Sequence, residues 1–229
     1  MLDIENLHVA YGQSEVLHGM SFGVATNEIV AIMGRNGMGK TTLMKTMMGI
    51  LPSTAGSIRL RGEDIVGLKS HQRVRKGVAY VPQGRMLFST MTVKENIETG
   101  LTASGDRKVP DDIYELFPVL LEMKGRRAGN LSGGQQQQLA IARALATKPK
   151  VLLLDEPTEG IQPSIIREMA RTLRRIRDER GLSIVVSEQV LSFALDVADR
   201  VLVVENGEIV HDEPRAALNE AKVARYLSV

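Results

Sequence analysis

Short runs of apolar residues recur along the chain and predict the strands of a buried sheet. The runs are Ile29–Met33, Val78–Val81, Val151–Leu154, Ile184–Val186 and Val201–Val204. Continuous apolar runs of this length, bounded by polar residues, are typical of strands covered on both faces. Helical patterns separate several of them, and such alternation favours an α/β fold with a mainly parallel core sheet and crossover helices.

Two regions have a different pattern. Near the N-terminus, apolar and β-forming positions occur in short, turn-rich stretches around Ile4, Val9, Val16, Ser21 and Ser57–Arg61. These stretches predict a small antiparallel β subdomain. Near the C-terminus, Asn206-Gly207 separates VLVVE from EIVHDE, which predicts a β-hairpin.

Helical patterns dominate residues 85–149. This part contains TVKENIETG, DDIYELFPVLLEMKG and QQQQLAIARALAT and no convincing core strand, so a helical insertion is expected there. A further amphipathic helix is predicted from Pro163 to a stop at Gly181. Its arginines are expected to form a solvated face rather than a lipid-facing patch: Arg167, Arg171, Arg174, Arg175, Arg177 and Arg180. We also expect Lys69 and Arg73–Lys76 to face solvent, and Met44, Met47 and Met48 to pack in the core.

The length of 229 residues and the 43% apolar composition suit one α/β domain with an inserted subdomain. We expect residues 1–229 to form this single domain. Residues 1–84 and 150–229 make its core, including the N-terminal antiparallel part, and residues 85–149 make its helical subdomain.

Composition excludes several classes of function. The net charge of +2 does not favour a nucleic-acid partner. The chain has no cysteine, which excludes disulfides, zinc-thiolate sites and thiol catalysis. The four histidines lack metal-ligand spacing. Neither a signal peptide nor a membrane span is evident, so another chain would have to supply any spans.

GRNGMGKTT follows the strand EIVAIM and opens a helical pattern. It matches G-x-x-x-x-G-K-[ST] in the strand–loop–helix setting that this motif requires, so it predicts a phosphate-binding P-loop. Lys40 is expected to reach the β- and γ-phosphates, and the Thr41 hydroxyl to bind Mg²⁺. The predicted nucleotide-binding residues here are Gly34, Arg35, Asn36, Gly37, Met38, Gly39, Lys40, Thr41 and Thr42.

VLLLDEP, residues 151–157, predicts a buried strand whose end carries two carboxylates. Asp155 is expected to hold Mg²⁺, and Glu156 to polarise the water that attacks the γ-phosphate. In a chain without a P-loop, an Asp-Glu pair before a proline turn would carry much less weight.

LSGGQ, residues 131–135, provides a second helix N-terminus suited to phosphate. Its candidate nucleotide-binding residues are Ser132, Gly133, Gly134 and Gln135. One γ-phosphate does not need two such sites from one chain. The economical interpretation is that this one serves a nucleotide on a partner chain.

These motifs, in the order GRNGMGKTT, VPQG, LSGGQ and VLLLDEP, resemble those of ABC-transporter ATPase subunits over essentially the whole chain. The resemblance implies a head-to-tail dimer that holds two ATP molecules, with Mg²⁺, between the P-loop of one chain and the LSGGQ of the other. It assigns Tyr11 to stacking on adenine and Gln83 to Mg²⁺ and the γ-phosphate. It further implies that residues 84–100 face a membrane partner.

The chain departs from this family at two places. The switch position, 33 residues after Glu156, usually holds histidine and here holds Gln189. An amide donates a hydrogen bond but does not titrate near neutral pH. Glu159-Gly160-Ile161-Gln162 stands where the family often has Ser-Ala-Leu-Asp. Two readings stay open: the departures impair this subunit's own site, or Gln189 substitutes adequately and both sites hydrolyse ATP.

The pair Glu188-Gln189 at the switch position resembles that of one ATPase subunit of the importers for branched-chain amino acids. Four stretches resemble most the urea and short-chain amide branch of that group: HQRVRKGVAYVPQGR, YELFPVLLEMKGRR, GGQQQQLAIARAL and DEPTEGIQPS. The resemblance implies four kinds of partner: a second ATPase subunit, identical or different, two transmembrane permease subunits and, indirectly, a solute-binding protein. The location it implies is the cytoplasmic face of the membrane, peripheral through the permease, for a chain that is soluble when isolated. The alternatives are an export ATPase and a soluble ABC protein without a transport role.

Overall fold

The computed structural model describes residues 1–227, so the last two residues of the expected domain lie outside the described part. The strands are β1 Leu2–Tyr11, β2 Ser14–Val24, β3 Ile29–Met33, β4 Ala55–Leu60, β5 Glu63–Asp64, β6 Val78–Val81, β7 Val151–Asp155, β8 Ser183–Glu188, β9 Arg200–Glu205 and β10 Glu208–Pro214. The α-helices are α1 Lys40–Met47, α2 Ser70–Lys76, α3 Val93–Ser104, α4 Asp111–Leu116, α5 Pro118–Glu122, α6 Gly133–Leu145, α7 Pro163–Arg180, α8 Leu191–Val197 and α9 Glu220–Leu227. Two 3₁₀ turns are η1 Ala128–Asn130 and η2 Arg215–Ala217.

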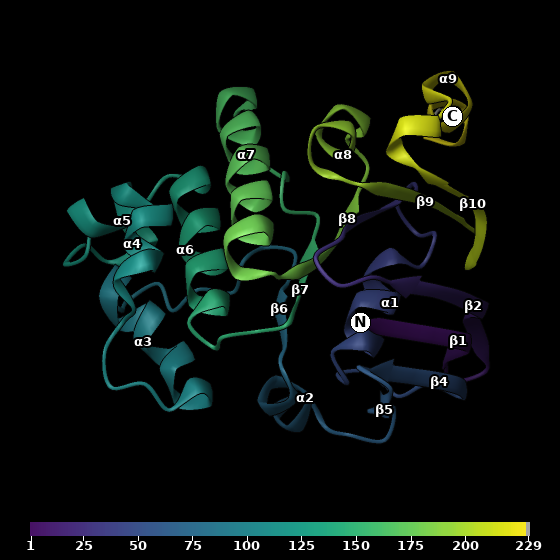
Figure 1. Ribbon diagram of the computed structural model, residues 1–229, viewed down its shortest axis with the longest axis horizontal. Coiled ribbons are helices and arrows are strands. Elements are labelled where there is room, and N and C mark those ends of the chain that lie inside the picture. The colour runs from purple at the N-terminus through teal and green to yellow at the C-terminus, as the bar shows by residue number, and fades with distance from the viewer. Residues whose placement is uncertain (228–229) are drawn as a thin grey trace.

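The central sheet has the order β10-β9-β3-β8-β7-β6 (Figure 1). Neighbours from β9 to β6 pair in parallel, and β10 pairs antiparallel with β9 through the turn at Asn206-Gly207. The predicted parallel sheet and the predicted C-terminal hairpin are therefore both confirmed. Parallel pairing brings the carboxyl ends of β3, β7 and β8 to one edge, which is where open α/β sheets bind ligands.

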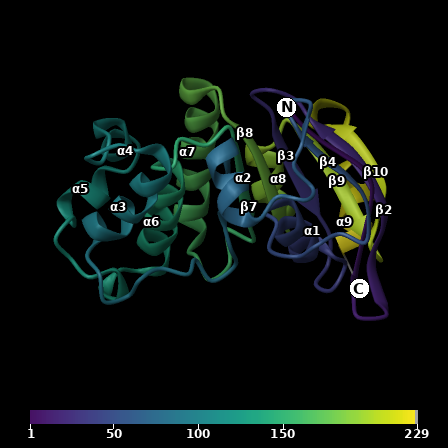
Figure 2. The same cartoon turned by 90° about the horizontal axis from the view of Figure 1, so that it is seen from below.

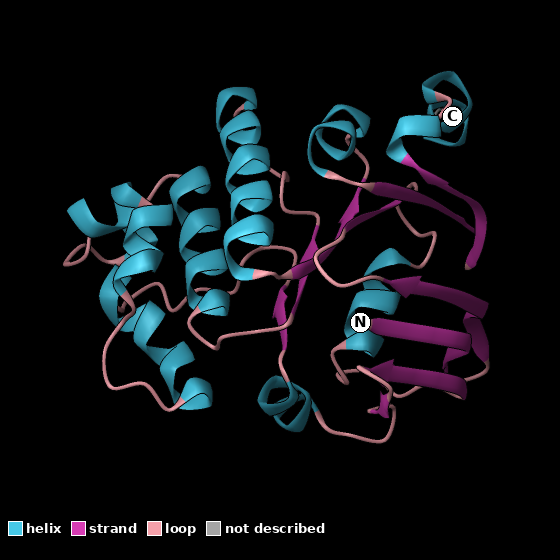
Figure 3. Cartoon of the chain, viewed as in Figure 1, coloured by secondary structure: helices cyan, strands magenta, loops and turns pink. Residues whose placement is uncertain are grey.

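A second sheet, in the order β2-β1-β4-β5, is antiparallel throughout. It confirms the predicted antiparallel subdomain, although β1 and β2 run for 10 and 11 residues and are longer than the sequence pattern suggests. Figure 3 shows these strands gathered at one end of the molecule and the helices α3 to α6 at the other.

The central sheet separates two apolar layers. Along β3, Ile29, Ala31 and Met33 belong to the layer with α6, α7 and α8, whereas Val30 and Ile32 belong to the layer with α1 and the antiparallel sheet. Successive strand side chains point to opposite faces. A continuous apolar run is therefore what a strand covered on both sides requires.

Helices α3 to α6 form the expected insertion between β6 and β7 (Figure 2). Residues 82–150 contain no strand, and Thr92 and Arg127 make only an isolated bridge. Helix α7 ends where predicted, with Gly181 in the left-handed region at φ 59°. No helix within residues 1–227 has the length and apolar character that crossing a membrane requires.

Arg73 is buried, contrary to the prediction from the sequence. It was expected to face solvent, but only 2% of its surface is exposed. Its guanidinium donates to the carbonyls of Thr46 at 2.7 Å and Met47 at 2.8 Å, which end α1, and to those of Leu68 at 3.0 Å and Val66 at 2.6 Å. Burial lowers the pKa of Arg73. The last carbonyls of a helix lack partners within it, and Arg73 supplies donors to two of them.

The other side-chain expectations hold. Met44, Met47 and Met48 are buried beside the central sheet. The arginines of α7 are exposed or half-buried, and Arg175, Arg177 and Arg180 pair with acidic side chains.

Candidate functional site

The loop at residues 34–39 joins the buried end of β3 to the start of α1. Gly39 precedes the helix at φ 101° and offers no side chain to cap it. A Cβ at Gly34 would lie 2.6 Å from the Val204 carbonyl oxygen, so a larger residue does not fit there. A cavity of about 280 Å³ lies against this loop, lined by Val16, Asn36, Gly37, Gly39, Lys40, Thr41, Thr42, Gln83 and Glu156. A helix start without a side-chain cap, facing a cavity, suits an anion.

Lys40 is 4% exposed and is held by the loop that it follows. Its Nζ donates to the carbonyls of Gly34 at 2.7 Å and Arg35 at 3.0 Å. The same nitrogen lies 3.3 Å from Glu156 Oε1. The buried ammonium thus has oxygen partners on the loop and on β7's carboxyl end, as a buried charge requires.

Asp155, the last residue of β7, collects three hydroxyl groups. Thr41 Oγ1 lies 3.2 Å and Ser187 Oγ 2.5 Å from its Oδ1, and Tyr80 OH lies 3.1 Å from its Oδ2. Burial and the charge of Asp155 raise the pKa of Tyr80, so this phenol stays a donor. Carboxylate and hydroxyl oxygens are ligands that Mg²⁺ prefers, so Asp155 and Thr41 fit a magnesium ion beside the loop.

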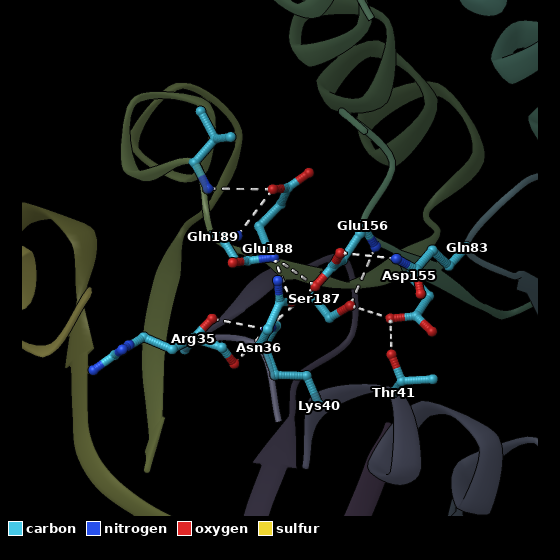
Figure 4. Close-up of polar contacts among 12 residues, drawn as sticks. Arg35, Asn36, Lys40, Thr41, Gln83, Asp155, Glu156, Ser187, Glu188 and Gln189 are labelled. Carbon is cyan, nitrogen blue, oxygen red and sulfur yellow. Dashed lines mark hydrogen bonds and ion pairs between the residues drawn. The ribbon is translucent and has the colours of Figure 1, made fainter. Parts of the chain in front are cut away.

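Glu156 follows in an unusual conformation, with φ at 47°. Its two carboxylate oxygens face three donors, which Figure 4 shows converging from different elements. Lys40 and the Gln189 amide, at 3.0 Å, approach Oε1, and Gln83 Nε2 lies 3.2 Å from Oε2. A non-glycine residue in the left-handed region is uncommon and costs conformational energy, and within the described residues Glu156 shares this conformation with seven others, among them Arg61 and Lys148.

Gln189 lies just past β8, at the sheet edge where its position in the sequence places it. Besides Glu156, its Nε2 donates to Asn36 Oδ1 at 2.8 Å. The amide thus connects the P-loop to the carboxylate at the end of β7 (Figure 4). The switch role of Gln189 stays a prediction, and the group that would fill it is an amide, which donates hydrogen bonds but does not titrate near neutral pH.

The remaining P-loop side chains lie at the surface or against a hairpin. Arg35, Asn36 and Gly37 are exposed. The carbonyl of Met38 accepts from Gly207 N at 3.2 Å, so the β9–β10 turn supports the loop. Tyr11 is 49% exposed at the end of β1, with its OH 3.4 Å from Thr42 Oγ1.

The signature residues Ser132, Gly133, Gly134 and Gln135 are not among the residues that line the P-loop cavity. Ser132 Oγ accepts from Gln135 N at 3.4 Å, and Gln135 Oε1 accepts from Ser132 N at 3.0 Å. This reciprocal capping box closes the start of α6. A Cβ at Gly133 would lie 3.1 Å from the Gly160 carbonyl oxygen, so the signature lies beside the segment that follows β7.

Three residues and one turn support the site without having been given a role from the sequence: Tyr80, Ser187, Glu188 and the Asn206-Gly207 turn, which contacts Met38. Ser187 and Glu188 carried a signal, since both are polar residues at the end of an apolar strand. Tyr80 carried none, because one tyrosine in the strand VAYV looks like an ordinary core residue.

Comparison with known proteins places the chain in a family. The family model described as ABC transporter matches residues 17–159. The chain is 45% identical over 227 residues to BraG of Pseudomonas aeruginosa, a high-affinity branched-chain amino acid transport ATP-binding protein, with 97% of each chain covered. It is 34% identical to LptB of Haemophilus influenzae, the ATP-binding protein of a lipopolysaccharide export system, over 98% of this chain and 95% of that protein.

Solved structures agree with the fold. A nucleotide-free ATP-binding cassette from an ABC transporter matches with a TM-score of 0.84 and 26% identity, over 97% of this chain and 93% of that one. A structure of an ABC-transporter ATP-binding cassette in its ADP conformation matches with a TM-score of 0.81 and 27% identity, over 99% of this chain and 94% of that one. The matched family model, the relatives covered almost end to end and the geometry around the P-loop agree. The chain therefore belongs to the ABC transporter family as one of its ATPase subunits.

Proposed function

We propose that this chain binds ATP and Mg²⁺ at the P-loop and hydrolyses the nucleotide with Glu156. The observation that carries this proposal is the set of side chains converging there from separate elements: Lys40, Gln83, Asp155, Glu156 and Gln189 (Figure 4). Lys40 and the amides of residues 36–41 bind the phosphates, and Thr41 and Asp155, with Gln83, hold Mg²⁺. The ion offsets phosphate charge when bound.

Glu156 acts on water in this proposal. Its carboxylate accepts a hydrogen bond from the attacking water at one Oε and takes up the proton as the water oxygen bonds to the γ-phosphorus, while the bond from that phosphorus to the bridging oxygen breaks and ADP leaves with this oxygen. Gln83 and Gln189 orient the carboxylate through the hydrogen bonds that they already donate to it. The Gln189 amide donates hydrogen bonds but does not exchange a proton near neutral pH. Its role at the switch position is therefore limited to positioning the Glu156 carboxylate.

Two ATPase chains complete each site in this proposal. The Ser132–Gln135 helix start lies outside the P-loop cavity, so it serves the nucleotide of a partner chain. Tyr11, at the exposed end of β1, stacks on the adenine. The partner is a second ATPase subunit, identical or different.

A groove between the core and the helical insertion suits the permease. Its cavity of about 460 Å³ is lined by apolar side chains from both parts and includes Met86 and Phe88, which are 72% and 50% exposed. Both residues lie in the 84–100 segment. We place the permease on this groove. The chain then works at the cytoplasmic face of the membrane, with residues 85–149 moving as the helical unit.

The transported solute is urea or a short-chain amide in this proposal, with branched-chain amino acids as the alternative. The stretches HQRVRKGVAYVPQGR and DEPTEGIQPS favour the first. The 45% identity to BraG supports the importer group and favours the second. The likeness to LptB makes export the competing function.

The test is ATPase activity of the whole complex, purified from source membranes through a tag on this chain and supplied with its solute-binding protein. Stimulation by urea or acetamide supports the first solute class, and stimulation by leucine alone moves the chain to amino-acid import. A complex that lacks importer permeases would contradict import altogether.

A further inference from the structure

Three consecutive residues at the end of β8 hold the end of β7. Ser187 Oγ donates to Asp155 Oδ1 at 2.5 Å, and Glu156 N donates to the Ser187 carbonyl at 3.0 Å. Gln189 Nε2 donates to Glu156 Oε1 at 3.0 Å. Between them lies Glu188, which the proposed mechanism does not use.

Glu188 is a buried carboxylate bound to backbone amides of two different segments. It is 2% exposed. Oε1 accepts from Thr158 N at 3.0 Å, two residues past Glu156, and Oε2 accepts from Gln189 N at 3.0 Å and Val190 N at 3.3 Å. Burial raises the pKa of Glu188, and hydrogen bonds from the Thr158 side chain and from these backbone amides partly oppose that rise. Burying a carboxylate is costly, so a position that only needed filling would favour an apolar residue.

The two oxygens of Glu188 therefore fix the distance between the turn that carries Glu156 and the backbone of Gln189. One oxygen holds the turn that carries Glu156 at its strained φ of 47°. The other holds the backbone of Gln189, whose amide contacts the Glu156 carboxylate. Strained backbone persists only where its surroundings enforce it. Glu188 and Ser187 supply that enforcement from the neighbouring strand.

We propose that Glu188 is a positioning residue for hydrolysis that acts through Gln189: it sets the Gln189 amide against the Glu156 carboxylate. The inference rests on the proposed role of Glu156. It goes further by assigning a function to a residue outside the nucleotide motifs.

Glu188→Gln tests the proposal with almost no change in shape. An amide has only one acceptor oxygen, so its NH₂ group must face the N–H groups of one of the two segments. In the tagged transporter complex we expect kcat for ATP to fall about tenfold, the worth of one hydrogen bond to a charged group, with KM within twofold of wild type. Glu28→Gln is the matched control. Its carboxylate also accepts a backbone N–H, from Ala25, at the start of β3, and its kcat should stay within twofold.

A double-mutant cycle separates positioning from a merely structural role. If Glu188 acts through Gln189, then Glu188→Gln combined with Gln189→Ala has the same kcat as Gln189→Ala alone. Multiplying effects, or an unchanged kcat in Glu188→Gln, overturn the inference. Glu188→Asp, which keeps the charge but shortens the reach, takes the same place in the cycle if Glu188→Gln does not fold.

A spectroscopic measurement on the isolated chain needs no turnover. The side-chain ¹⁵N–¹H signals of Gln189 should move toward free-amide positions in Glu188→Gln and stay in place in Glu28→Gln. Unmoved signals in Glu188→Gln contradict the inference.

Glu156→Gln distinguishes the failure of this inference from the failure of the proposed function. Full turnover in Glu156→Gln overturns the role of Glu156 itself. Lost turnover in Glu156→Gln, together with multiplying effects of the substitutions at Glu188 and Gln189, overturns only the positioning role of Glu188.

Discussion

Two helices in this molecule begin after glycine-containing loops suited to phosphate, yet they start differently. Helix α1 follows Gly39 with no side-chain cap, and its first residue Lys40 is buried among oxygen atoms. Helix α6 starts with a full capping box in which Ser132 and Gln135 satisfy each other. The first helix start opens on a cavity that Gln83 and Glu156, which follow β6 and β7, also line, and the second is closed by its own side chains.

The difference indicates how work is divided between the two helix starts. In the proposed function, the groups that bind the phosphates are already assembled around α1, and Arg73 donates to the carbonyls at the carboxyl end of this helix. The α6 start stays stable while it has no phosphate, because its cap replaces one. It would exchange that cap for a nucleotide on a partner chain.

The largest expected effect is at Glu156, which lies beside the start of α1. Glu156→Gln should lower turnover about 10²–10³-fold because a general base is lost, while the affinity for ATP stays within a few-fold. Phosphate release and equilibrium ATP binding, measured on the same preparation, check this. Glu168→Gln, at an exposed glutamate of α7, is the control. Equal turnover of Glu156→Gln and wild type would remove Glu156 as the base.

Arg73→Leu tests the support of α1 from behind. It leaves the carbonyls of Thr46, Met47, Leu68 and Val66 without their buried donor, so the free energy of unfolding should fall by about 3 kcal/mol. Denaturant unfolding measures it. Arg75→Leu, at an exposed position of the same helix, should change stability by less than about 0.5 kcal/mol. Equal losses in the two variants would contradict the special role of Arg73.

Lys40→Ala sharpens the comparison in terms of ATP affinity. Removing the ammonium should weaken ATP binding by the value of a charged hydrogen bond, about 1.5–3 kcal/mol or roughly 10–150-fold. Calorimetric titration of the isolated chain with ATP and Mg²⁺ provides the measurement. Retained affinity would mean that the backbone amides of residues 36–41 bind the phosphates without the lysine.

The smallest expected effect is at the start of α6, where Ser132 caps the helix. Ser132→Ala removes the side-chain cap of α6 and should cost about 1 kcal/mol of stability, with ATP affinity of the isolated chain unchanged. Thermal unfolding and the same calorimetric titration check both parts. A loss of affinity comparable to that of Lys40→Ala would end the distinction between the two helix starts, since it would place Ser132 at this chain's own nucleotide.

The site was predictable from sequence wherever its chemistry is local. The P-loop residues 34–42 are contiguous, and Asp155 and Glu156 end a recognisable apolar strand. Gln189 was singled out because it stands 33 residues after Glu156, where the family resemblance puts the switch residue. The contacts of Glu188 and Tyr80 were not predicted because they join residues 30 and 75 positions apart in the sequence.

The sequence alone determined the parallel sheet, the antiparallel subdomain, the helical insertion and the order of the nucleotide motifs. Apolar periodicity and short motifs carry this information within a few neighbouring residues. Tertiary structure decided the burial of Arg73, the left-handed Glu156 and the contact of the Asn206-Gly207 turn with the P-loop. A charged residue is buried only where distant carbonyls need its donors, and a strained backbone persists only where neighbouring strands hold it. Neither the distant carbonyls nor the neighbouring strands can be identified from the residues adjacent to Arg73 or Glu156 in the sequence.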